Sequence, residues 1–141
     1  MHHRRYRDIV PFAIALTVIL AVLAIFQAAL IFGAPIGQYA WGGQHRVLPL
    51  RLRIGSAVSI VIYALIVLIA FDRLGAIDVF PDTFSVIAMW VIFAYFTLGI
   101  FMNAISRSKP ERNVMTPLSA VLAVLSLLIA LGVGSMAIAI A

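Results

Sequence analysis

The side chains able to do chemistry are few, and most gather between Gly33 and Arg53, the longest polar break in an otherwise apolar chain. This segment, GAPIGQYAWGGQHRVLPLRLR, combines glycine, proline, aromatic and basic residues. Guanidinium and imidazolium groups donate strong hydrogen bonds to carboxylate and phosphate oxygens. The segment therefore contains a candidate site for an anionic ligand or lipid headgroup, formed by Trp41, His45, Arg46, Arg51 and Arg53.

A plain structural role for the same segment stays open beside this one. Its glycines permit tight reversals, and Tyr39 and Trp41 are residue types that settle at the headgroup level of a bilayer. The segment would then be a re-entrant or interfacial loop whose arginines contact lipid phosphates. In either case we expect its first half to fold back against the helix ends, burying Ile36 and Val47 and placing Arg46 near the mouth of the bundle.

Several other chemistries lack the residues they need. The chain has no cysteine, which excludes disulfides, iron–sulfur clusters and cysteine-ligated zinc. Its three histidines, His2, His3 and His45, lie outside the apolar stretches, so no facing pair is available for haem. No nucleophile–base pair or carboxylate dyad is apparent. We therefore expect no catalytic residue, no metal and no cofactor, and we favour a non-enzymatic protein.

Composition sets the fold class. Of 141 residues, 65% are hydrophobic and only 11% are charged, whereas soluble domains are about 25% charged. Crossing a bilayer takes about 20 consecutive apolar residues. The sequence predicts an all-α membrane protein, a single domain spanning 1–141 in which four transmembrane helices form a bundle with an interfacial first loop. The predicted helices cover residues 9–32, 54–71, 83–105 and 114–140.

Proline and acidic residues shape the expected loops. Pro110 predicts a break after Ile105, and Pro117 suits the first turn of the fourth helix. With these bounds, none of the four spans contains a charged residue. The acidic residues Asp72, Asp78 and Asp82 fall in the second loop, where their wide spacing is typical of solvated surface rather than of a cation site.

Small and polar residues recur at helical spacing in each span, a pattern that allows close approach of helices in lipid. The candidate polar residues of the bundle interior are Gln27, Tyr63, Tyr95 and Asn103. Gln27 is expected to be an interhelical hydrogen-bond partner rather than a substrate ligand. The stripe of the first helix is Ala13, Thr17, Ala21, Ala24 and Ala28, and that of the fourth is Ser119, Ala123, Ser126, Ala130, Gly134 and Ala137.

Basic residues predict topology and partners. The net charge of +5 is confined to tails and loops, which indicates contact with membrane lipids and their anionic headgroups rather than with nucleic acid. Loops 33–53 and 106–113 hold more arginine and lysine than the opposite side, so the positive-inside rule favours a cytoplasmic position for both. The expected location is the bacterial plasma membrane. The chain is expected to be a monomer, a homodimer or part of a larger membrane complex.

The run from Gly33 to Pro49, together with the later Ser-Arg-Ser-Lys-Pro-Glu-Arg-Asn before Thr116-Pro117, resembles small uncharacterised four-helix membrane proteins of actinobacterial type. This resemblance covers most of the chain and implies no activity.

Two functions from different classes fit these observations. The first is a non-enzymatic accessory or lipid-binding membrane protein. The alternative is a small oligomeric transporter or channel for a small molecule or ion, which would need a continuous polar path through the bundle. Gln27, Tyr63, Tyr95 and Asn103 would line such a path or serve only as packing contacts.

Overall fold

A computed structural model describes the backbone of residues 2–133 and the side chains of residues 11–133. Its helices are α1 (His2–Ile31), α2 (Leu50–Arg73), α3 (Asp82–Ala104) and α4 (Lys109–Ala130), with two short 3-10 helices, η1 (Gly37–Tyr39) and η2 (Trp41–Gly43), between α1 and α2. The described part of the chain contains no strand. Four helices are long and apolar enough to cross a membrane, which confirms the predicted four-helix membrane fold.

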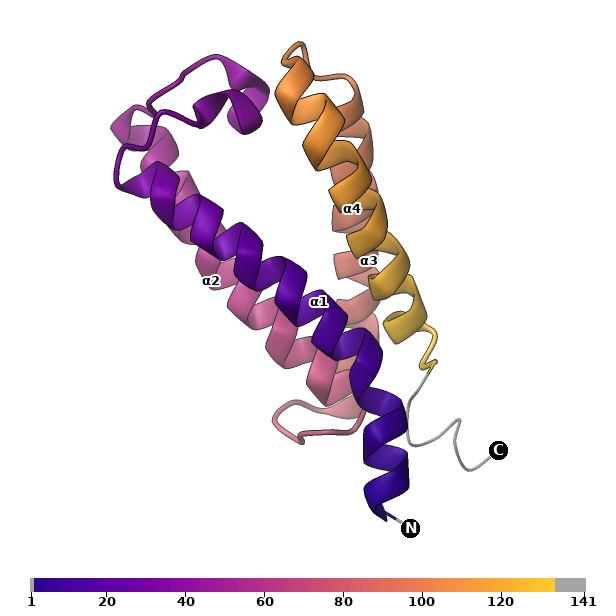
Figure 1. Ribbon diagram of the computed structural model, residues 1–141. Helices are drawn as coiled ribbons and strands as arrows, with labels where there is room; N and C mark the ends of the chain where they lie inside the picture. The colour runs from indigo at the N-terminus through magenta and orange to yellow at the C-terminus, as the bar shows by residue number, and fades with distance from the viewer. Residues whose placement is uncertain (1, 134–141) are drawn as a thin grey trace.

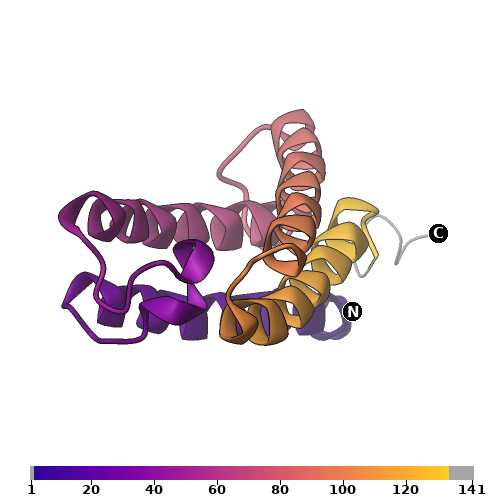
Figure 2. The same ribbon diagram turned by 90° about the horizontal axis from the view of Figure 1, so that it is seen from above.

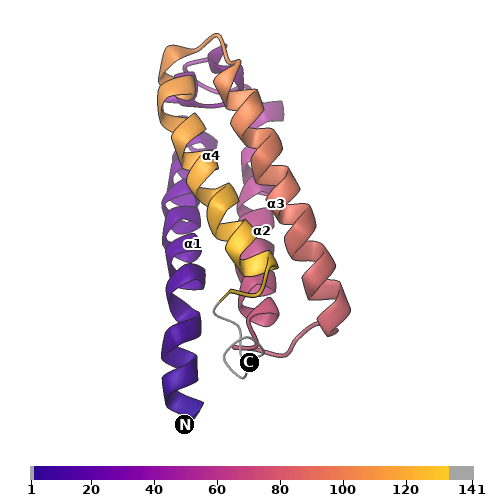
Figure 3. The same ribbon diagram turned by 90° about the vertical axis from the view of Figure 1, so that its right-hand side faces the viewer.

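The helices form two antiparallel hairpins that meet at an angle. Hairpin α1–α2 and hairpin α3–α4 converge near the N-terminus and diverge toward the loops at the other end (Figure 1). Seen from above, η1 and η2 lie between the diverging ends of the two hairpins (Figure 2). The view from the side shows α4 and α3 in front of α1 and α2 (Figure 3). The α1–α2 loop and the α3–α4 loop lie at the same end of the molecule.

An apolar core holds the hairpins together at their converging end. Leu16, Leu20, Ile66, Met89 and Ile129, contributed by all four helices, are almost completely buried. Lipid is as apolar as these side chains, so their contribution comes from close packing rather than from removal of surface from water. The core closes one end of the bundle and leaves the other end to be closed by the loop.

All four helices begin earlier than the sequence predicted: α1 begins at His2 instead of residue 9, α3 begins one residue early at Asp82, and the starts of α2 and α4 also differ. Helix α2 begins at Leu50, directly after Pro49, so Arg51 and Arg53 belong to its first turn. Helix α4 begins at Lys109 and contains Pro110 in its first turn, where a missing N–H costs no hydrogen bond. The predicted start at residue 114, with Pro117 opening the helix, was therefore wrong, and the predicted continuation beyond residue 133 lies outside the described residues.

The observed bounds of the helices correct the expectation that the spans are free of charge. Glu111, expected in the third loop, lies in the first turn of α4 and is buried. Asp72, expected on a solvated surface, lies in the last turn of α2 and is also buried. Its carboxylate accepts hydrogen bonds from the N–H groups of Val79 and Phe80, at 2.7 and 2.9 Å, and from the Ser85 hydroxyl. Asp72 thus organises the turn between α2 and α3.

The predicted stripe of small residues coincides with the buried face of α4 but not with that of α1. On α4, Ala123, Ser126 and Ala130 are buried and Ser119 is half-buried, while Gly134 and Ala137 lie outside the described residues. On α1, Ala21 is exposed, and the buried face is formed largely by leucine. These buried residues are Ala13, Leu16, Leu20, Leu23, Gln27 and Leu30. Helix α1 therefore packs largely through leucine side chains, and the most extensive close approach between helices is that of α3 and α4.

Candidate functional site

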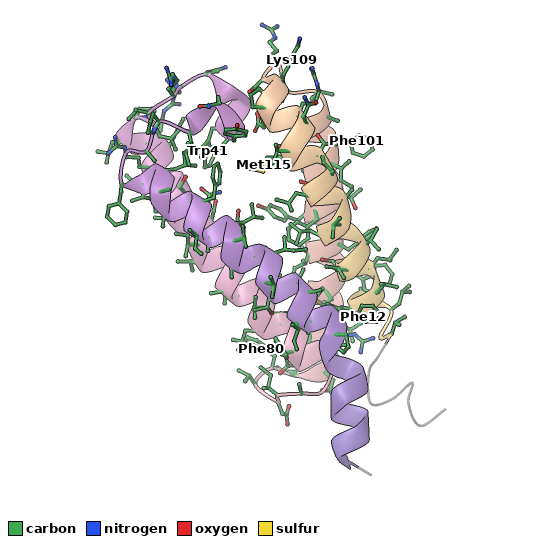
Figure 4. All side chains as sticks on the ribbon, viewed as in Figure 1. Phe12, Trp41, Phe80, Phe101, Lys109 and Met115 are labelled. Atoms are coloured by element: carbon green, nitrogen blue, oxygen red, sulfur yellow. The ribbon has the colours of Figure 1, made fainter. Side chains whose placement is uncertain are left out.

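A cavity of about 290 Å³ lies between the two hairpins, beneath the loop that carries η1 and η2. All four helices and the loop contribute to its wall. It reaches from Glu111 to Leu122 along α4, a distance of about 16 Å at 1.5 Å per residue. Figure 4 shows Trp41 and Met115 on opposite sides of this space, whereas Phe101 points away from it.

The cavity is enclosed more completely on one side than on the other. On the side of α1 and α4, Leu23, Gln27 and Leu122 are buried. On the side of α3, Leu98 and Met102 line the cavity and remain more than half exposed. These exposed apolar side chains make the α3 side the less enclosed wall of the cavity.

Trp41 forms the roof in a backbone conformation that is unusual for a bulky residue. Its φ is 53°, in the left-handed region that non-glycine residues seldom adopt. The indole Nε1–H donates to the fully buried Ser56 hydroxyl at 3.2 Å. The ring also lies so close to Gly55 that a Cβ there would stand 2.7 Å from its Cη2 atom. Helix α2 therefore holds the ring through a glycine and a serine in its first two turns.

A second set of contacts joins the loop to the start of α4. The Ser108 hydroxyl donates to the Gln38 carbonyl, and the Gly42 N–H donates to Glu111 Oε1 at 3.4 Å. Gly43 has a φ of +70°, and a Cβ there would collide with the Ser108 side chain. The loop between α1 and α2 is thus tied to the opposite hairpin and bridges the open end of the bundle.

The expectation that the loop folds back against the helix ends agrees with these contacts, but its details differ. The Gly37 N–H donates to the Arg46 carbonyl at 2.8 Å, which closes the loop on itself. Ile36 is half-buried and Val47 is exposed, so the expected burial of Val47 was wrong. Leu48 is the buried apolar residue of this segment instead.

Only one of the five residues of the candidate anionic site lines the cavity. Trp41 lines the cavity, whereas His45, Arg46, Arg51 and Arg53 do not. Arg46 and Arg51 are exposed and His45 is half-buried. The Arg53 side chain is occupied: its Nε donates to the Leu48 carbonyl at 2.8 Å and its guanidinium lies against Gly33. Arg46 and Arg51 are therefore exposed at the loop end of the molecule, and none of the three arginines lines the cavity.

The four candidate polar residues of the interior all line the cavity. Gln27 Nε2 donates to the Tyr63 hydroxyl at 3.2 Å, which joins α1 to α2, and Asn103 Nδ2 donates to the Ser119 hydroxyl at 2.9 Å, which joins α3 to α4. Tyr95 lines the less enclosed side and is 48% exposed. Each hydrogen bond links the two helices of one hairpin, so the space between the hairpins is left free.

Gln27 has a further, unsatisfied polar atom. Its side chain is 8% exposed, and its Oε1 has no hydrogen-bond partner. A buried amide oxygen without a partner costs free energy, and such groups are uncommon in folded proteins. This acceptor is available to a molecule that enters the cavity.

Sequence reasoning missed Glu111, the acidic residue of the site. Its side chain lines the cavity and is 7% exposed, and its Oε2 accepts a hydrogen bond from the Ser106 hydroxyl. The run Ser108-Lys-Pro-Glu111 carries the serine and glutamate spacing of a capping box, which signals the start of a helix. That signal places Glu111 in the first turn of α4, but only the packed structure turns it toward the cavity.

Fold and site together define a class: a small integral membrane protein of four spans with an internal cavity large enough for a ligand. Comparison with protein families, curated proteins and solved structures finds no match for this chain. Among the described residues no cluster of histidine, aspartate or glutamate has a geometry suited to a metal ion.

Proposed function

We propose that this protein is a non-enzymatic membrane protein that takes an amphiphilic molecule from the bilayer and holds it in the cavity between its two hairpins. The observation that carries the proposal is the cavity of about 290 Å³, walled by apolar side chains and holding a few polar groups. Ligand pockets in proteins are commonly about 300 to 1,000 Å³ and have this kind of lining. The size suits a single-chain amphiphile or a small drug-like molecule better than a whole two-chain lipid.

The two ends of the cavity suit the two ends of an amphiphile. Its upper end, at the loop, holds Trp41, Glu111 and Asn103, whereas Leu23, Phe96 and Leu122 wall its lower end. A molecule with one polar group would place that group beneath the loop and its apolar part toward the middle of the membrane. Entry past Leu98 and Met102 would not require the apolar part to cross water.

The basic residues near the loop support a second role for lipid. Arg46 and Arg51 are exposed at the same end of the molecule as Arg107 and Lys109. Basic residues near a membrane surface attract anionic lipid, each contributing about 1 kcal/mol. These side chains would hold anionic headgroups around the loop and keep the roof of the cavity at the membrane surface.

A transporter or channel receives less support from this arrangement. The polar residues reach only part of the way through the bundle, because Leu16, Leu20, Ile66, Met89 and Ile129 fill its converging end. A channel needs a continuous polar path, and a transporter would have to separate these packed side chains. Binding without transport needs neither.

Fluorescence of the two tryptophans tests the proposal. In Trp90→Phe, Trp41 in the cavity roof is the only tryptophan, and in Trp41→Phe only Trp90 on the exposed side of α3 remains. A neutral single-chain amphiphile with a brominated tail, added to nanodiscs, quenches an indole that it contacts. We expect saturable quenching of Trp41 at a low bromine content, and quenching of Trp90 that rises only with the bulk content of the bilayer.

A pair of matched variants ties the signal to the cavity. Ser59 lines the cavity, and Val61, two residues further along the same helix, is exposed and does not. In the Trp90→Phe background, Ser59→Phe should remove the saturable component, whereas Val61→Phe should keep it. Parallel quenching of Trp41 and Trp90 at every bromine content would show that the cavity takes up no amphiphile.

A further inference from the structure

Electron-rich groups line the polar parts of the cavity. Of its lining residues only Glu111 carries a charge, and no lysine, arginine or histidine contributes to the wall. Around Glu111 stand Tyr39 and Trp41 from the loop, and Tyr63 and Tyr95 lie on the neighbouring helices. We infer that the ligand is an organic cation with an apolar body, an inference that rests on the proposed function and specifies its ligand class.

Glu111 lies at the partly positive N-terminus of α4 but has no ion-pair partner among the described residues. Its hydrogen-bond partners, the Ser106 hydroxyl and the more distant Gly42 N–H, are both neutral. A carboxylate has about four acceptor positions, so two donors leave room for more. Burying a carboxylate without an opposite charge is costly. A cation beneath the loop supplies that charge and recovers part of the cost.

The aromatic side chains favour the same sign of charge. The faces of tryptophan and tyrosine rings attract cations, by about 0.5 to 2 kcal/mol for each well-placed pair. A quaternary ammonium group uses this attraction well because it has no N–H to donate. The unpartnered Oε1 of Gln27 is another acceptor, and together with the Glu111 carboxylate it favours a positive ligand over an anion.

The sign of the lining differs from the sign of the whole chain. The net charge is +5, and the exposed arginines at this end attract anionic headgroups from outside. The Arg112 guanidinium, one residue from Glu111, donates to the Ser106 carbonyl at 3.3 Å and does not line the cavity. An anionic ligand inside the cavity would face Glu111. The cavity therefore favours cations, whereas the exposed basic residues outside it favour anions.

Three brominated amphiphiles with the same tail test the inference, one with a trimethylammonium head, one with a neutral hydroxyl head and one with a sulfate head. Trp41 quenching in Trp90→Phe, divided by Trp90 quenching in Trp41→Phe, removes differences in partition into the nanodisc. We expect saturation at the lowest concentration for the ammonium head and at the highest for the sulfate head. Glu111→Gln should weaken ammonium binding about tenfold or more and leave the hydroxyl compound unchanged.

Two further variants keep the result interpretable. Asp78→Asn, at an exposed carboxylate on the opposite end, makes the same change in net charge and should leave the order of the three heads intact. Tyr39→Leu, in the loop beside Glu111, should weaken ammonium binding a few-fold more than hydroxyl binding, and it tests the inference even if Glu111→Gln does not fold. Equal binding of the three heads, or equal loss of all three in a folded Glu111→Gln, would contradict the inference that the ligand is a cation. Either result would still agree with binding of an amphiphile in the cavity. Absence of saturable quenching by every head would overturn the proposed function.

Discussion

Glycines decide how closely the loop and the helices approach each other. Gly55 touches the Trp41 ring, whereas Gly99, at a similar depth on α3, has free space: a Cβ there would stand 3.6 Å from the Ser119 hydroxyl oxygen. Both lie inside helices, where glycine costs about 1 kcal/mol relative to alanine. The same substitution should therefore have opposite effects at the two positions.

Gly55→Ala should lower stability, and Gly99→Ala should leave it unchanged or raise it. At Gly55 the new methyl group would displace the Trp41 ring and its hydrogen bond to Ser56, and such overpacking costs about 1 to 3 kcal/mol. Thermal unfolding in detergent measures the stability, and the emission of Trp41 in the Trp90→Phe background reports the ring. If both variants gain stability equally, the ring does not pack against Gly55.

Different parts of helix α4 contact the loop and pack against α3. Its first turn supplies Glu111 and the Ser108 contact to the loop, and its middle supplies the small residues that approach α3. Its last carbonyl groups are reached by the other hairpin, because Arg73 Nη2 donates to the Ala130 carbonyl at 3.1 Å. Helix α4 is therefore fixed at both ends, and the cavity wall between them has a defined position.

Enlarging a side chain on the buried face of α4 should separate α4 from its neighbours. Ala123 is 4% exposed and Val124, the next residue, is 56% exposed. Ala123→Leu should lower the unfolding temperature, since overpacking costs about 1 to 3 kcal/mol, whereas Val124→Leu should have little effect. The two unfolding curves in the same detergent provide the comparison. A similar loss in both variants would place the lipid-facing side of α4 elsewhere.

The whole molecule is a pair of hairpins joined at both ends by different means. Packed apolar side chains join them near the N-terminus, and hydrogen bonds between the loop and α4 join them at the opposite end (Figure 1). Polar contacts at the membrane surface exchange with water more easily than a packed core separates. The loop end is therefore the end that can loosen while the packed core stays closed, which would widen the side of the cavity that Leu98 and Met102 line.

Orientation in the membrane follows from the same geometry. The loops 32–49 and 105–108 lie at one end and the turn after Arg73 at the other, so we expect Gln44→Cys and Arg107→Cys to react from one side and Asp78→Cys from the opposite side. The positive-inside rule predicts that the first side is cytoplasmic. The chain contains no cysteine of its own, so single-cysteine variants report one position each.

A membrane-impermeant maleimide applied to intact cells and to inside-out vesicles provides the measurement. Labelling of Gln44→Cys and Arg107→Cys from outside the cell would reverse the orientation. Labelling of these two variants from different sides would contradict the arrangement of four spans.

Local sequence was sufficient for the number of spans, their helical nature and the position of the long first loop, because hydropathy and proline act over one or two turns. The same reasoning predicted Gln27, Tyr63, Tyr95 and Asn103 as interior polar residues, since polar groups in lipid seek partners within the bundle. Gln27, Tyr63 and Asn103 form interhelical hydrogen bonds, whereas Tyr95 is 48% exposed. The tertiary structure alone decided that these residues surround a cavity, that Trp41 closes it and that Glu111 faces it. The contact between Gly42 and Glu111 joins residues 69 positions apart, and no local pattern specifies which distant helix a loop meets. That choice depends on how two hairpins diverge, which is a property of their packed core and not of any one segment.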